Sequence, residues 1–282
     1  MARPDPIEIA RSKLVDGVRA VFNDTASGEA PIPPSDEAWF AKDSPIRMVH
    51  ADVVSMMVGG VSALLLQMLH PHALRGVLDF SDFRHDMHGR LRRTARFIAV
   101  TTYGHRDDAD AAIDRVNRIH AQVKGTLPDG SPYSATDPRV LAWVHVTEAL
   151  MFLEAWLVHV RPAMPMAEQD EYFRQFALIA RRLGADPVPE TKAEAQAVFR
   201  ELRGDLKSTR EAREVAQLIL KGRTHGAAGA VQPFLATAAV ELIPSFARTM
   251  LELERPRWSA LPSRLVTNGM GKTLRWAFKQ KP

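Results

Sequence analysis

Helical periodicity of apolar residues is the feature that most limits what this chain can fold into. Apolar side chains recur at steps of three and four through most of the sequence, and the alternation typical of half-buried strands is almost absent. The chain has 282 residues, 46% of them hydrophobic, which is enough to bury one large core with room for a ligand. We therefore predict an all-α fold built as a single helical bundle.

Capping residues, prolines and glycines place the predicted helices along the chain. The first 43 residues are expected to form an amphipathic helix over 6–22 and then an extended wrap, and residues 44–282 the main domain. The helices predicted there are 46–69, one from Pro71, 90–103, one after Asp107 that ends at Gly125, 138–159, 167–183, 191–205, 209–221, and 233–253 bent at Pro244.

Several classes of protein are excluded by what the sequence lacks. The absence of cysteine rules out disulfides, iron–sulfur clusters, thiolate haem ligation and cysteine-based zinc sites. No phosphate-binding glycine loop, zinc-protease motif or serine-hydrolase motif is present. The net charge is +4, but the basic residues are dispersed among acids, so we expect no nucleic-acid binding, while peripheral membrane contact stays open. No secretory signal is visible, which predicts a cytoplasmic protein.

His120 is the first candidate functional residue. In the predicted helix that ends at Gly125, it falls between Ile113, Val116 and Val123 at steps of three and four, which places it on the buried stripe. A neutral imidazole in such a position must form hydrogen bonds or bind a metal. From spacing alone, a hydrogen-bonded core histidine is the commoner outcome.

Arg90 and Thr94 are four residues apart and share one face of the preceding predicted helix, 90–103, with Phe97. An arginine at the head of a partly apolar face suggests an anionic partner, because its guanidinium matches carboxylates in geometry and charge. A threonine one turn further could donate a hydrogen bond to a bound oxygen species. The alternative is an internal ion pair from Arg90 to Asp86 or Glu148, with Thr94 packed as a small apolar group.

The first core helix carries a second group of candidates. Gly59 and Gly60 cost about 1 kcal/mol each relative to alanine inside a helix, a cost that close approach of a helix or a flat ligand would justify. Gln67 and His70 are three residues apart near the predicted end of this helix, and are expected on one side of it.

His145 and Glu148 are also three apart, on the predicted helix 138–159. Such a pair raises the alternative of a non-haem metal site. A di-iron carboxylate bundle, however, needs a Glu-x-x-His motif from each of two helices, and no glutamate here is followed by histidine three residues later. We therefore set that class aside.

The order and spacing of these motifs resemble the rubber oxygenase superfamily, which includes the latex clearing proteins and the catalytic domain of the mycophenolic acid pathway oxygenase. The resemblance covers about residues 40–190. The motifs that carry it are Gly59-Gly60, the run 65–71, Gly76-Val77, Phe83, Arg90-Leu91 with Thr94, His120 with Val123 and Gly125, Tyr133 with Ala135 and Asp137-Pro138, and Trp143-Val144-His145.

The resemblance implies a globin-like helical bundle that encloses a haem-sized cavity and binds one haem b. It also implies that His120 is the proximal iron ligand and that Arg90 and Thr94 lie on the distal side. We expect His120 to have one ring nitrogen facing the cavity and the other paired to the protein, as is usual for ligating histidines. His70 and His145 are the competing ligands.

The chain departs from the latex clearing proteins at two points. Where they carry a lysine that can close the distal iron position, this chain has Arg93, which keeps its proton and is a poor ligand. Where they carry a candidate base upstream of the arginine, the only nearby acids are Asp79, Asp82 and Asp86. Rubber cleavage is therefore not expected.

Two hypotheses follow. The first is a haem-dependent oxygenase that uses dioxygen on a small or medium apolar substrate, with His120 on the iron and Arg90 and Thr94 as the catalytic pair. The second is a haem- or lipid-binding helical module without turnover. The residues expected to line the cofactor are Gly59, Gly60, Gln67, His70, Arg90, Thr94 and His145.

Overall fold

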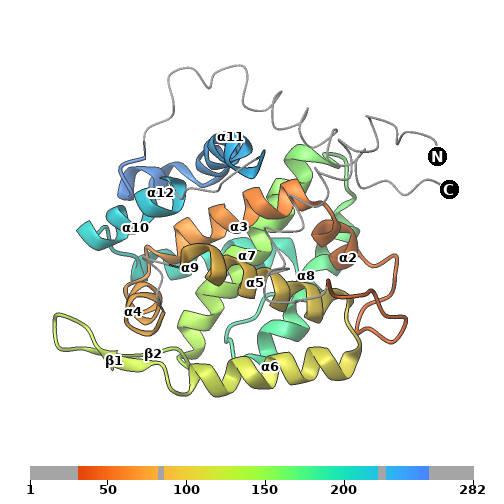
Figure 1. Ribbon diagram of the computed structural model, residues 1–282, viewed down its shortest axis with the longest axis horizontal. Coiled ribbons are helices and arrows are strands. Elements are labelled where there is room, and N and C mark those ends of the chain that lie inside the picture. The colour runs from red at the N-terminus through yellow and green to blue at the C-terminus, as the bar shows by residue number, and fades with distance from the viewer. Residues whose placement is uncertain (1–30, 82–85, 222–226, 254–282) are drawn as a thin grey trace, which may run out of the picture.

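The computed structural model describes residues 31–81, 86–221 and 227–253, and the predicted helix over 6–22 lies outside them. The all-α prediction is confirmed (Figure 1). The helices are α2 Pro45–Ala51, α3 Val53–Gln67, α4 Pro71–Phe80, α5 Met87–Tyr103, α6 Arg106–His120, α7 Pro138–His159, α8 Met166–Arg182, α9 Lys192–Leu202, the short 3₁₀ helix η2 Arg203–Asp205, α10 Arg210–Lys221, α11 Ala227–Leu242 and α12 Ser245–Met250.

The core is organised around α3 and α7, which pack along each other through the middle of the molecule (Figure 1). Trp143 of α7 is fully buried, stacks on Phe199 of α9 at 5.2 Å between ring centroids, and donates from Nε1 to the Leu66 carbonyl of α3 at 3.3 Å. By length and composition α7 could cross a membrane, but its most apolar window is 72% buried. It is therefore apolar on all sides as a central bundle helix is expected to be.

The predicted single helix over 46–69 is wrong, because the chain breaks at Asp52. The backbone of Asp52 is extended, with φ −88° and ψ 107°, and its carboxylate accepts a hydrogen bond from Ser55 N at 2.9 Å as the N-cap of α3. The axes of α2 and α3 differ by 92° as a result. Apolar periodicity runs through the break, and only the cap marks it.

The predicted end of the fourth helix at Gly125 is also wrong. Helix α6 stops at His120, and the chain continues into a hairpin of β1 (Lys124–Thr126) and β2 (Pro132–Ser134) that projects from the bundle (Figure 1). A Cβ on Gly125 would lie 2.8 Å from the Tyr133 ring, so glycine is required here by strand packing and not by a helix end. Tyr133 donates to Asp79 Oδ2 at 2.6 Å, which fixes the hairpin to α4.

Other predicted boundaries are confirmed. Helix α4 begins at Pro71 and α7 at Pro138, where Asp137 accepts from Arg139 N at 2.9 Å as the N-cap. Helix α5 ends before Gly104, and the bend at Pro244 separates α11 from α12. The segment before α2 lies across the end of α5, where Ser35 N donates to the Tyr103 carbonyl at 2.8 Å. Helix α11 packs on α3.

Candidate functional site

Three predicted site residues from three helices come together in the structure. Arg90 of α5 is close enough for its charge to lower the pKa of His120 of α6, and His120 in turn lowers the pKa of His145 of α7. Burial is the larger cause of both shifts. The predicted anion-binding arginine and the predicted iron ligand therefore lie within reach of each other's charge, although thirty residues separate them in sequence.

His120 is the last residue of α6, not a mid-helix residue. It is partly buried, its Nδ1 is buried, and neither ring nitrogen forms a hydrogen bond with any described residue. The expectation that its second nitrogen would be paired to the protein is therefore wrong. Helix α6 ends at His120, so Val123 does not extend its apolar stripe. Burial and Arg90 lower its pKa, which favours the neutral form that binds metals.

Arg90 makes no ion pair within the described ranges. Asp86 caps α5 by accepting from Gly89 N at 2.9 Å, and its other carboxylate oxygen pairs with Arg93 at 3.2 Å. Neither Asp86 nor Glu148 lies within 4.0 Å of the Arg90 guanidinium, so the internal ion pair considered from the sequence is not formed. Burial lowers the pKa of Arg90, with a smaller contribution from Arg93. A desolvated guanidinium without a counter-ion is costly and suits an anionic ligand.

Thr94 is exposed, and no hydrogen bond of its hydroxyl is found in the part of the chain that the structure describes. The prediction that it packs on the same partly apolar face as Arg90 is not supported by a contact. Thr101, two turns further along α5, is buried and donates to the Phe97 carbonyl at 2.9 Å. Its hydroxyl is thus used inside its own helix.

Gln67 and His145 flank Glu148, which the sequence pattern indicated only as an ion-pair partner or as part of a metal pair. The Gln67 amide donates to Thr147 Oγ1 at 3.5 Å and interacts with the Glu148 carboxylate. His145 Nδ1, itself without a hydrogen bond, lies 4.0 Å from Glu148 Oε2. Burial raises the pKa of Glu148 to about 7, and the Gln67 interaction opposes this shift. The available signal was the i, i+3 spacing of His145 and Glu148 on an otherwise apolar helix.

Replacing Glu148 with glutamine should stabilise the fold above pH 7. The folded-state pKa is about 7 and the ordinary value is 4.5, so the folded protein binds more protons than the unfolded chain between these values. Stability of the natural protein therefore falls as pH rises through this window, and the neutral amide removes that fall. We expect a gain on the order of 2 kcal/mol at pH 8 and almost none at pH 4.5. Urea unfolding at the two pH values measures it.

The matched control for this measurement is Glu154→Gln on the same helix. Glu154 is partly exposed and pairs with Lys192 at 2.8 Å, so a cation lies beside its carboxylate, unlike that of Glu148. Its variant should show no gain at pH 8. A Glu148→Gln protein with the same pH dependence as the natural chain would contradict the raised pKa.

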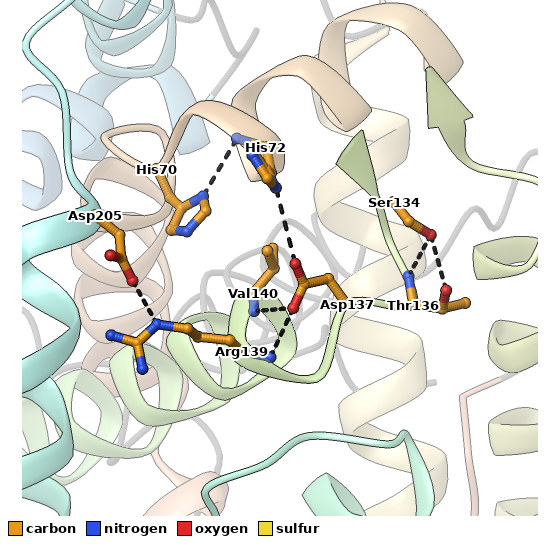
Figure 2. Close-up of polar contacts among 8 residues, drawn as sticks. All are labelled: His70, His72, Ser134, Thr136, Asp137, Arg139, Val140 and Asp205. Atoms are coloured by element: carbon orange, nitrogen blue, oxygen red, sulfur yellow. Dashed lines mark hydrogen bonds and ion pairs between the residues drawn. The ribbon is translucent and has the colours of Figure 1, made fainter. Parts of the chain in front are cut away.

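His70 lies apart from this cluster, in a polar corner between α4, α7 and η2 (Figure 2). Its Nδ1 accepts from His72 N at 3.2 Å as the N-cap of α4, and the ionisable groups around it are His72, Asp137, Asp205 and Arg139. Burial lowers its pKa to about 4. The expectation that Gln67 and His70 lie on one side stays a prediction: α3 ends at Gln67, and His70 N donates to the Gln67 carbonyl at 3.1 Å in the turn that follows.

The two core glycines differ in their surroundings. A Cβ on Gly59 would lie 2.8 Å from the Met151 carbonyl oxygen and 2.9 Å from the Phe152 Cα, so Gly59 lets α3 and α7 approach closely. A Cβ on Gly60 would meet only the Phe152 ring, at 3.6 Å. The close approach at Gly59 is thus made by a helix and not by a flat ligand.

A haem-sized cavity is not shown by the described residues. His145 lines a small cavity of about 10 Å³ between α7, α8 and the loop 185–189, with apolar walls. A groove of about 550 Å³ lies elsewhere, between residues 32–35 and the facing parts of α5 and α6, and none of the predicted site residues lines it. Among the described residues, no group of three or more histidines and acids could hold a metal ion. An iron held here would depend on a porphyrin for its other ligands.

Comparison with known families adds one finding to this geometry. Residues 47–276 match the family model described as ER-bound oxygenase mpaB/B'/Rubber oxygenase, catalytic domain. Comparisons with curated proteins and with solved structures gave no match. The matched region contains the whole Arg90–His120–His145 cluster and covers most of the chain. The chain therefore belongs to the family of the mpaB and rubber oxygenase catalytic domains.

Proposed function

We propose that this protein is a haem b-dependent oxygenase that uses dioxygen on a small or medium apolar substrate. The family supports oxygenase chemistry. The observation that carries the haem assignment is the pairing of two unsatisfied groups. His120 has a buried ring nitrogen without a hydrogen bond, and it adjoins Arg90, a partly buried guanidinium without an ion pair.

The chemistry of these two residues suits two parts of a haem, the iron and a propionate. His120 would hold the iron through its imidazole, and Arg90 would bind a propionate carboxylate. Haem, when bound, supplies the oxygen chemistry, and the protein supplies the ligand, the pocket and the electrostatics. Gln67 and His145, both over nine-tenths buried, would form the polar part of the wall beside it.

The protein's own groups have definite protonation states for this task. Lowered pKa values keep His120 and His145 neutral at pH 7, the latter with a pKa of about 4. The Arg90 guanidinium keeps its charge in spite of burial. We propose that the Thr94 hydroxyl, one helical turn beyond Arg90, donates a hydrogen bond to dioxygen.

The absorption spectrum of the purified protein tests this proposal. We expect a Soret band in the protein as isolated or after addition of haem, and a shift of that band with dithionite and carbon monoxide. A protein that stays colourless after haem addition would remove the haem assignment. Haem binding without dioxygen consumption above that of free haem, in the presence of a reductant, would favour the non-catalytic binding module.

Arg90→Ala should weaken haem retention while leaving the fold intact. Loss of a charge-assisted hydrogen bond costs on the order of 1.5–3 kcal/mol, which corresponds to about 10- to 100-fold weaker retention. Transfer of haem to excess apomyoglobin measures the loss rate. Arg93→Ala is the matched control, because Arg93 is exposed and pairs with Asp86. Unfolding of the Arg90 variant with unchanged haem retention would assign Arg90 a structural role instead.

A further inference from the structure

A tyrosine and a histidine form a polar pair in the aromatic part of the core. Tyr172 of α8 is fully buried, and its hydroxyl lies 3.4 Å from Nε2 of His50 of α2. The other ring nitrogen of His50, Nδ1, lies 2.9 Å from Oγ1 of Thr102 of α5, which is also fully buried. The phenol of Tyr172 is therefore shielded from solvent and has an imidazole beside its oxygen.

These two contacts define a path for the phenol proton. A neutral imidazole has one donor and one acceptor nitrogen, so a phenol that donates to His50 Nε2 leaves the ring proton on Nδ1, facing Thr102 Oγ1. If the phenol proton passes to Nε2, both N–H groups of the imidazolium then have acceptors, the Tyr172 oxygen and Thr102 Oγ1. The surroundings of His50 thus suit the product of the transfer as well as its start.

Oxidation is the reaction that makes this transfer favourable. Burial raises the pKa of Tyr172 well above its ordinary value and lowers that of His50 to about 3, so at rest the phenol keeps its proton and the ring is neutral. Loss of one electron turns a phenol into a strong acid, and even a weakly basic imidazole can then accept its proton. A tyrosine without a base at hydrogen-bond distance is much harder to oxidise.

A series of ring contacts leads from this pair toward the candidate site. The ring centroids of Tyr172 and Phe176 are 6.0 Å apart, and those of Phe176 and His145 are 6.1 Å apart. His145 is among the residues expected to line the cofactor. Electrons, unlike protons, move between closely spaced aromatic rings without a hydrogen bond, so these contacts are sufficient for electron transfer to reach Tyr172.

The other two tyrosines of the chain lack this combination. Tyr103 donates to the Arg47 carbonyl at 2.9 Å, which cannot take up a proton, and the Arg47 guanidinium lies 5.3 Å from its ring centroid and opposes loss of an electron. Tyr133 donates to Asp79 from the projecting hairpin, in an apolar cluster separate from that of Tyr172. Tyr172 is therefore the tyrosine suited to oxidation in the core.

We propose that Tyr172 and His50 form a redox-active pair that takes up oxidising equivalents from the oxygenase centre. One electron passes from the Tyr172 ring to a one-electron oxidant formed from haem and peroxide, and the phenol proton moves to His50 Nε2. Tyrosine becomes a neutral phenoxyl radical, the imidazole becomes an imidazolium, and the oxidant is reduced by one electron. A one-electron reductant such as ascorbate then returns the electron, and the proton returns from Nε2 to the phenol oxygen. This inference rests on the proposed function, since haem supplies the oxidant.

The first test uses the protein without haem. Ultraviolet photolysis of the frozen protein removes electrons from its tyrosines, and electron paramagnetic resonance detects the radicals. In the double variant Tyr103→Phe/Tyr133→Phe, Tyr172 is the sole tyrosine. We expect a phenoxyl radical there, with the lowered gx value of a radical that accepts a hydrogen bond. The difference between the natural protein and Tyr172→Phe should give the same signal without relying on the double substitution.

His50→Gln in the same background tests the base. The glutamine amide can accept a hydrogen bond from the phenol but cannot take up its proton. We expect the radical yield of Tyr172 to fall about tenfold or more, because a positioned base is lost. Circular dichroism checks that the variant is folded. An unchanged yield and g-tensor in His50→Gln, or a Tyr172 radical without a hydrogen bond, would overturn the pairing.

The second test uses the haem-loaded protein and hydrogen peroxide. We expect a tyrosyl radical signal in samples frozen soon after mixing, lost in Tyr172→Phe and kept in the matched control Tyr103→Phe. Bleaching of the haem by peroxide should be faster in Tyr172→Phe, because the oxidising equivalents stay at the haem. A signal that survives in Tyr172→Phe, or no tyrosyl signal in the natural protein, would overturn the redox role. Failure to bind haem would defeat the proposed function, and photolysis would still decide whether Tyr172 and His50 act as a pair.

Discussion

His120→Ala should abolish the Soret band, or leave it weak and displaced, in a protein that keeps its helical content. His120 terminates α6, its Nδ1 is buried and unpaired, and it is the histidine that adjoins Arg90. Alanine removes the proposed iron ligand but, because His120 makes no hydrogen bond with any described residue, it breaks no side-chain hydrogen bond of the fold. Absorption spectroscopy with haem added in excess, together with far-ultraviolet circular dichroism, measures both outcomes.

Variants of the other two candidate iron ligands, His145 and His70, provide the comparison for this prediction. His145 belongs to the same cluster, whereas His70 caps α4 in a corner with His72, Asp205 and Arg139 (Figure 2). We expect His70→Ala to cost stability through the lost cap, on the order of 1 kcal/mol, and to leave the Soret band in place. An intact spectrum in His120→Ala, with loss in His70→Ala or His145→Ala, would show that iron is held elsewhere.

Gly59→Ala should destabilise the fold by about 1–2 kcal/mol, although alanine is the better helix former. A Cβ at this position would lie 2.8 Å from the Met151 carbonyl oxygen and 2.9 Å from the Phe152 Cα, and both are backbone atoms. The two central helices would therefore have to separate, and such overpacking costs about 1–3 kcal/mol in well-packed cores. Because the atoms in the way belong to the backbone, this overpacking cost exceeds the gain of about 1 kcal/mol in helix propensity that alanine brings. Urea unfolding measures the difference.

Gly60→Ala is the matched control one residue away. Its Cβ would make an ordinary contact with the Phe152 ring at 3.6 Å, so the propensity gain should dominate and the variant should be up to about 1 kcal/mol more stable. Equal effects of the two substitutions would contradict the close packing of α3 on α7 at Gly59.

Local signals located the helix starts that the structure confirms. Asp137-Pro138 and His70-Pro71 each combine a capping side chain with a proline in the first turn, and both effects act within a few residues. Periodicity succeeded for α7, whose apolar residues and length need no tertiary partner to be recognised. It failed at Asp52 and beyond His120, because apolar residues continue at helical spacing through a sharp turn and into a hairpin.

The candidate site likewise has features that the sequence determines and features that only the tertiary structure determines. Sequence by itself determined the all-α class, the family and the identity of Arg90, His120 and His145 as candidates, since residue types and their spacing are one-dimensional properties. Tertiary structure alone decided which of them meet, because burial and charge depend on neighbours from other helices. In the folded protein His70 lies apart from Arg90, His120 and His145, Thr94 is exposed, and Arg90 forms no ion pair with a described residue. Packing of the helices also raises the pKa of Glu148, whose neighbours Gln67 and Tyr172 belong to α3 and α8. A desolvation penalty exists only once those helices have packed.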